Sequence, residues 1–129
     1  MSELTVVHSD SAPKAVGPYS QAIACNGVLY CSGQIGLDPA SGKLAGDSIK
    51  EQAAQVMRNL SAVLAAAGAG VSDILKVNIF LTDMGDFPLV NEIYANWLGE
   101  HRPARATVAV AALPLGAKVE MDLVARISG

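Results

Sequence analysis

The side chains best suited to chemistry in this 129-residue chain are Arg105, Glu120 and Tyr19. Arg105 ends the segment Arg102-Pro103-Ala104-Arg105, where a strand of small apolar residues begins. A guanidinium there can bind a carboxylate through two parallel hydrogen bonds. From the pattern alone, an ion pair of Arg105 with Glu120 or Asp122 is the more common arrangement, because structural ion pairs are frequent.

The other candidates also have two interpretations. Glu120 alternates outward in an apolar strand, where its carboxylate can hold a water or form a salt bridge between subunits. Tyr19 follows Gly17-Pro18 and can present its hydroxyl to a ligand, although packing over a sheet edge is the commoner role of a loop tyrosine. Ser32 and Asn91 are weaker candidates, because a serine at a strand end and an asparagine on a helix are usually surface polar residues.

Several chemistries lack their sequence signatures. His8 and His101 are the two histidines, and no cluster of Cys, His and acidic residues has metal-binding spacing, so we expect no metal site. The chain has no phosphate loop, no dinucleotide fingerprint and no nucleophile elbow. Without a histidine-based triad, a Ser or Cys nucleophile is not expected. The chemistry that remains uses water, an acid and a cation.

Composition predicts one domain over residues 1–129. The net charge is −3 and no Lys/Arg run exists, which disfavours a nucleic-acid partner. No apolar run reaches the ~20 residues of a membrane helix, and the first residues do not resemble a secretory signal. Cys25 and Cys31 flank the hairpin turn Asn26-Gly27, which pairs Cys25 with Val28 and Ala22 with Cys31. Their sulfurs then point to opposite faces, so we expect reduced thiols in a cytoplasmic protein.

The hydrophobic pattern predicts an α+β fold in which two helices cover one face of a single mixed sheet. The expected strands are 4–8, 22–25, 28–32, 74–82, 106–112 and 118–127, and the expected helices are 49–67 and 87–98, with turns over 33–46. Ser48 and Glu51 form a capping-box pattern, Gly68 suits the end of the first helix, and Asp86 can cap the second. Leu75, Val77, Ile79 and Leu81 are expected to face the helices.

The other face of the sheet is predicted to stay open and half apolar. We expect Arg105 to point to it, together with Lys76, Asn78, Phe80, Thr107, Ala109, Glu120, Asp122 and Val124. An open face of this kind usually meets another subunit, so the pattern predicts a symmetric homo-oligomer.

Short motifs along nearly the whole chain resemble the RidA/YjgF family of imine and enamine deaminases. The matching segments are Gly17-Pro18-Tyr19-Ser20-Gln21-Ala22, Ser32-Gly33-Gln34-Ile35, Asn59-Leu60 with Ala65-Ala66-Ala67-Gly68, Val90-Asn91-Glu92-Ile93-Tyr94, Arg102-Pro103-Ala104-Arg105-Ala106-Thr107-Val108 and Val119-Glu120-Met121. Their order and spacing together make the resemblance specific.

The resemblance implies a homotrimer with a fold like the trimeric chorismate mutases and clefts between subunits. It implies that Arg105 and the backbone amide of Thr107 bind a substrate carboxylate, and that Glu120 positions or activates water. Tyr19, Ser32 and Asn91 would line the cleft. The implied substrates are 2-aminoacrylate, 2-aminocrotonate and their imine tautomers, released by pyridoxal-phosphate enzymes, and the products are 2-keto acids and ammonia. No cofactor is implied, and the role would be metabolite damage control.

Two departures from the family pattern and two alternative functions accompany this resemblance. Many relatives carry cysteine where this chain has Thr107, and the segment from Gly99 to Arg102 is shorter than in some relatives. One alternative is a carboxylate-binding protein without turnover. The other is an endoribonuclease that inhibits translation, which the charge balance and the lack of aromatic stacking platforms disfavour.

Overall fold

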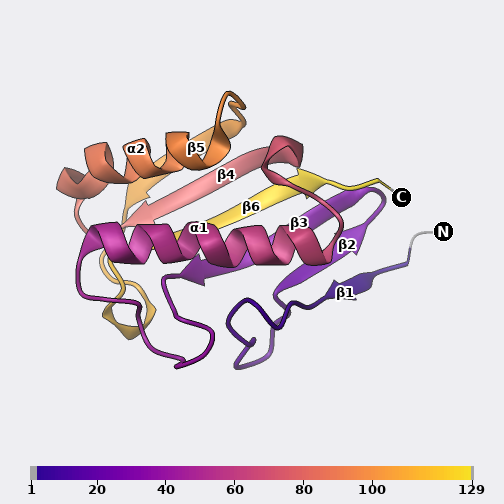
Figure 1. Cartoon of the computed structure of the whole chain (residues 1–129), viewed down its shortest axis with the longest axis horizontal. Helices are drawn as coiled ribbons and strands as arrows, with labels where there is room; N and C mark the ends of the chain where they lie inside the picture. The colour runs from indigo at the N-terminus through magenta and orange to yellow at the C-terminus, as the bar shows by residue number, and fades with distance from the viewer. Residues whose placement is uncertain (1–2, 129) are drawn as a thin grey trace.

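The computed structural model describes residues 3–128, and it forms one mixed sheet covered on one face by two helices (Figure 1). The strands are β1 (Thr5–Val7), β2 (Ala22–Cys25), β3 (Val28–Ile35), β4 (Ile74–Leu81), β5 (Ala104–Ala109) and β6 (Val119–Arg126). Their order in the sheet is β1-β2-β3-β6-β4-β5. β4 and β5 run parallel, and the other neighbouring pairs are antiparallel. The α+β prediction is confirmed.

Helix α1 (Ile49–Ala66) begins where its sequence predicts. The Ser48 hydroxyl accepts a hydrogen bond from the Glu51 backbone N–H at 3.1 Å, which satisfies one of the free amides of the first turn. Gly68 follows the helix with φ of +76°, a left-handed conformation that glycine adopts without strain. Local capping chemistry therefore fixes both ends of this helix.

Helix α2 (Phe87–Leu98) has the predicted bounds but not the predicted capping hydrogen bond. Asp86 occupies the N-cap position, but its side chain makes no capping hydrogen bond. A short 3₁₀ turn, Met84–Asp86, precedes the helix, and the Asp83 carboxylate accepts from the Gly85 N–H at 2.8 Å. The expected cap at Asp86 is wrong because this extra turn moves the capped amides three residues earlier.

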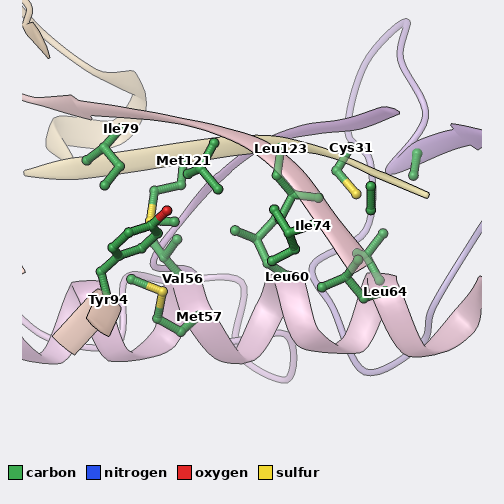
Figure 2. Packing of buried hydrophobic residues seen from close by; sticks show 14 of the residues in the cluster. Cys31, Val56, Met57, Leu60, Leu64, Ile74, Ile79, Tyr94, Met121 and Leu123 are labelled. Carbon is green, nitrogen blue, oxygen red and sulfur yellow. The ribbon is translucent and has the colours of Figure 1, made fainter. Parts of the chain in front are cut away.

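The hydrophobic core lies between the sheet and the two helices (Figure 2). Met121 and Leu123 of β6 meet Val56 and Leu60 of α1, and each of these side chains is buried. Tyr94 reaches the same layer from α2. This packing leaves the opposite face of the sheet uncovered by any helix of the described chain (Figure 1).

A bulge in β4 changes which side chains face this core. Ile74 pairs with Ala125 and Lys76 pairs with the preceding Val124, so β4 has one extra residue at this point. Ile74 is consequently buried, whereas Leu75 is 47% exposed. The prediction that Leu75 faces the helices is wrong, because a bulge reverses the alternation of side chains.

The parallel pairing of β5 reverses a second prediction. Arg105 lies opposite Val77 and Thr107 lies opposite Ile79, and these β4 partners are fully buried under the helices. Arg105, Thr107 and Ala109 therefore point to the helix side, and their expected place on the open face is wrong. Both faces of β5 carry mostly small residues, so no difference in hydrophobicity shows which face of the strand is turned toward the helices.

The first hairpin confirms its predicted register, with Cys25 opposite Val28 and Ala22 opposite Cys31. Both thiols are free, and burial, with a smaller effect of Asp122, raises the pKa of Cys31 to about 12.

β3 continues to Ile35 through an irregularity between Cys31 and Gln34, so the expected turn over its last three residues is wrong.

Candidate active site

Arg105 is held at the edge of the sheet by side chains of α2. Its Nη1 donates to the Asn91 Oδ1 at 2.5 Å. Its guanidinium lies 5.2 Å from the centroid of the Phe87 ring and 5.3 Å from that of the Tyr94 ring. Phe87, Asn91 and Tyr94 are spaced by four and three residues, which places them on one face of the helix. Cation–π contacts and one hydrogen bond therefore orient the cation.

A cavity of about 480 Å³ opens beside this cation, lined by Asn91, Tyr94, Ala95, Leu98, Arg102, Pro103 and Arg105. Within residues 3–128, the Tyr94 hydroxyl and the Thr107 Oγ1 are buried without a hydrogen-bond partner. Such groups are rare in folded proteins. Burial raises the pKa of Tyr94, although the charges of Arg105 and Arg102 oppose that shift. The surroundings of Arg105 thus combine positive charge with unused hydroxyl groups.

Glu120 lies on the opposite face of the sheet, above the backbone of Gly33. A Cβ atom placed on Gly33 would lie 2.5 Å from the Glu120 Oε2, so the missing side chain makes room for the carboxylate. Burial, with a smaller effect of Asp122, raises the pKa of Glu120. Asp122 itself accepts a hydrogen bond from Asn78 at 2.9 Å. A carboxylate of raised pKa holds a proton more readily, which suits it to exchange protons with a bound water.

Ser32 connects β3 to the loop that carries Tyr19. The Ser32 Oγ donates to the Ser20 carbonyl at 2.6 Å, and its backbone N–H donates to the Gln21 carbonyl at 2.9 Å. Gln21 is buried and donates from its Nε2 to the carbonyls of Ser9 and Pro13, which fixes the rest of the loop. Tyr19 itself is exposed and lines a second cavity of about 720 Å³.

The predicted site residues therefore form two separate groups in one chain. The first group, Arg105, Asn91 and Thr107, lies between β5 and α2. The second group is Glu120, Ser32 and Tyr19, around β3, β6 and the preceding loop. β6 and β4 separate β3 from β5, which sets the two strands roughly 14 Å apart at the usual strand spacing. The prediction that these side chains share one face is wrong within a single chain.

Several residues of the two groups had no role in the sequence prediction. Phe87 and Tyr94 fit an ordinary apolar stripe, and only their spacing from Asn91 indicates a shared polar site. Gly33 stands inside a strand, a position where glycine often marks a bulge or a close approach. Arg102 lines the Arg105 cavity, although its side chain is mostly exposed.

Among residues 3–128, no group of three or more His, Cys, Asp and Glu side chains could hold a metal ion. Neither helix of this part of the chain combines the length and apolar character needed to span a membrane.

Comparison with known proteins places the chain among close relatives. A family model described as endoribonuclease L-PSP matches residues 9–127. Protein DfrA of Myxococcus xanthus is 51% identical over 121 residues, which are 92% of each chain. The 2-iminobutanoate/2-iminopropanoate deaminase of Mus musculus is 45% identical over 93% of this chain and 89% of its own. The crystal structure of E. coli TdcF with bound serine has a TM-score of 0.91 and 35% identity, covering 96% of this chain and 99% of that one.

Proposed function

Because the chain belongs to the RidA/YjgF family, which the endoribonuclease L-PSP model matches, we propose that it hydrolyses reactive 2-imino and 2-enamino acids, such as 2-iminopropanoate and 2-aminoacrylate, to 2-keto acids and ammonia. The observation that carries the proposal is the fixed guanidinium of Arg105 at an open cavity. Among residues 3–128, no carboxylate forms an ion pair with it. Its bidentate donors therefore remain available for a substrate carboxylate.

The active unit in this proposal is a homotrimer whose clefts lie between subunits. Arg105 with the Thr107 amide and Asn91 would come from one subunit, and Glu120, Ser32 and Tyr19 from its neighbour. Their separation in one chain supports this arrangement. Exposed apolar side chains on the open sheet face, among them Tyr30 and Val108, support an assembly through that face.

The proposed reaction adds water across the C=N bond of the imine. An enamine first takes a proton on carbon and loses one from nitrogen, which gives the imine. The water oxygen then bonds to C2, the π electrons move to nitrogen, which takes a proton, and Glu120 accepts the proton that the water loses. In the carbinolamine the amino nitrogen takes a second proton, which the hydroxyl group loses, directly or through Glu120. The C–N bond then breaks, its electron pair leaves with nitrogen as ammonia, and the keto group forms.

This chemistry requires little from the protein beyond positioning. The imine is already electrophilic, so fixing its carboxylate beside a held water supplies most of the acceleration. The scheme involves no cofactor. The free thiols of Cys25 and Cys31 support the cytoplasm as the location.

A coupled assay tests the proposal. An amino-acid dehydratase or oxidase generates the imine in place, and semicarbazide traps the imine that escapes hydrolysis. We expect the wild-type protein to suppress semicarbazone formation and to speed keto-acid release, and the Arg105→Ala variant to do neither. Unchanged semicarbazone formation with wild-type protein, across several amino-acid side chains, contradicts the proposal.

A carboxylate-binding protein without turnover is the second candidate. The serine bound to TdcF favours it, because serine is a carboxylate ligand without an imine bond. Tight binding of small carboxylates by an inactive wild-type protein would support this candidate. The endoribonuclease activity named in the family model is less well supported for this chain. Its net charge is −3 and it has no Lys/Arg run, whereas RNA binding favours a positively charged surface.

A further inference from the structure

A second arginine, Arg102, lines the cavity beside Arg105, and the reaction above leaves it unused. None of the described residues that line this cavity is Asp or Glu. Within residues 3–128, the ion pairs involve neither arginine. Two positive charges therefore meet in one cavity without compensation. Such a site favours a ligand that carries two negative charges.

Arg102 is oriented by the end of α2. Its Nη1 donates to the Gly99 carbonyl at 2.7 Å and to the His101 carbonyl at 2.8 Å. Both bonds start from one terminal nitrogen, whereas a guanidinium has five N–H donors on three nitrogens. Within residues 3–128 its other N–H groups donate to no protein acceptor, and they suit a carboxylate, which the planar group binds in a fork.

The spacing of the two arginines suits a small ligand with a charge at each end. Arg102 and Arg105 are three residues apart, so their Cα atoms lie at most about 11 Å from one another. Both residues line the same cavity of about 480 Å³, a volume in the usual range for small-molecule sites. Both charges also act on one phenol: burial raises the pKa of Tyr94, and the two arginines partly oppose that rise.

We propose that Arg102 binds the second carboxylate of a dicarboxylic 2-imino acid, such as the imine of glutamate, while Arg105 binds the carboxylate next to C2. This inference rests on the deaminase function proposed above and names its preferred substrate class. The bonds made and broken stay the same, and the products are ammonia and a dicarboxylic 2-keto acid. The charge at the far end of the side chain is the feature that Arg102 selects.

The kinetic test compares two imines with five carbon atoms, those of glutamate and of norvaline, each generated by an amino-acid oxidase with catalase present. We expect a higher kcat/KM for the glutamate imine. In Arg102→Gln, the ratio of the two kcat/KM values falls about tenfold or more, since a charge-assisted contact to one substrate is lost. Arg102→Lys keeps the charge and restores part of the ratio. Arg126→Gln also removes one positive charge, from an exposed pair with Asp73 outside the cavity lining, and leaves the ratio unchanged.

A binding test separates this inference from the deaminase proposal. Isothermal titration compares glutarate with pentanoate, two inert ligands of equal carbon number, on wild type, Arg102→Gln and Arg102→Lys. We expect glutarate to bind more tightly to wild type and to lose this advantage in Arg102→Gln, with an unchanged circular dichroism spectrum. Equal affinity for the two ligands, or equal loss of both imine activities in Arg102→Gln, overturns the inference. Wild-type inactivity toward both imines overturns only the deaminase proposal, because the titration still decides the role of Arg102.

Discussion

The guanidinium of Arg105 and the carboxylate of Glu120 lie on opposite faces of one sheet, and β4 runs between the strands that carry them. Arg105 faces the helices from an edge strand, where α2 orients it. Glu120 faces the open side above Gly33. A small imino acid bound by Arg105 therefore cannot reach Glu120 of the same chain. If both groups act on one substrate, each must come from a different subunit.

Hybrid assemblies test this arrangement directly. Arg105→Ala and Glu120→Gln should each have only a small residual activity alone, because every site lacks one group. Unfolded together in equal amounts and refolded, they should recover about a quarter of wild-type activity, since a quarter of the sites in a cyclic trimer then combine an intact Arg105 with an intact Glu120. Native mass spectrometry verifies that mixed trimers form. No recovery in mixed trimers would show that the two groups do not share a site between subunits.

Removal of the Arg105 guanidinium should weaken carboxylate binding without unfolding the protein. For Arg105→Ala we expect a loss of about 1.5–3 kcal/mol of binding to the transition state, or about 10- to 100-fold in kcat/KM. Arg105→Lys should be intermediate, because it keeps the charge but not the planar fork. The semicarbazide assay measures the rates, and size-exclusion chromatography measures the assembly. Dissociation of Arg105→Ala into smaller species would assign the residue a structural role instead.

The pH dependence of activity should report Glu120. Burial, and to a lesser extent Asp122, raises its pKa above the ordinary value of 4.5. Because the proposed base is the ionised form, kcat/KM should rise with pH through this raised pKa. Glu120→Gln should lower the rate and remove that acid limb. An acid limb that persists in Glu120→Gln would assign the titration to another group.

The pH dependence of folding stability should also report the Glu120 carboxyl, and its raised pKa fixes the direction of the change. Its raised pKa means that the folded state binds the proton more tightly than the unfolded state. The resulting stability is present below the unfolded pKa and is lost as pH rises through the folded pKa. As pH rises from the unfolded pKa through the folded pKa of Glu120, Tm of Glu120→Gln should therefore increase relative to wild type. The lowered pKa of Asp73 acts with the opposite sign, but it contributes equally to both proteins. A constant difference in Tm would contradict this linkage.

Gly33 should be required for the position of the Glu120 carboxylate. In Gly33→Ala the new Cβ would lie 2.5 Å from Oε2 and 2.9 Å from Cδ, so the flexible end of Glu120 must move. A displacement of this size typically costs up to about 100-fold in rate when the group acts on substrate. Gly70→Ala is the matched control, since its Cβ would meet nothing within 4 Å and its φ is −137°. Wild-type activity in Gly33→Ala would argue against a direct role of Glu120.

The features that the sequence predicted correctly depend on short-range chemistry. Ser48 and Glu51 are three residues apart and cap α1, and Asn26-Gly27 takes the positive φ values that a tight hairpin requires. Such signals need no knowledge of the rest of the chain. The helix boundaries and the hairpin register follow from them.

The orientation of the site residues depends instead on long-range pairing. Arg105 faces the helices because β5 runs parallel to β4 with Arg105 opposite Val77, residues that are 28 positions apart in the sequence. The one-residue bulge at Ile74 reverses the alternation of side chains between the two faces of β4. No local pattern encodes either feature. The split of the site residues between the two faces could therefore be found only from the sheet itself.

The open face of the sheet should hold the assembly together. Tyr30 is 53% exposed and Val108 is 45% exposed on this face, in register with Val124 and Phe80 respectively. Val108→Asp should give a smaller species by light scattering, with an unchanged circular dichroism spectrum, because Val108 lies outside the core. Leu89→Asp, on exposed α2 surface, is the control and should keep the assembly. The dissociated Val108→Asp protein should also lose deaminase activity, since each site would then lack the groups of its neighbour. A dissociated protein with full activity would mean that one chain completes the site, and that the opposed faces of Arg105 and Glu120 serve separate purposes.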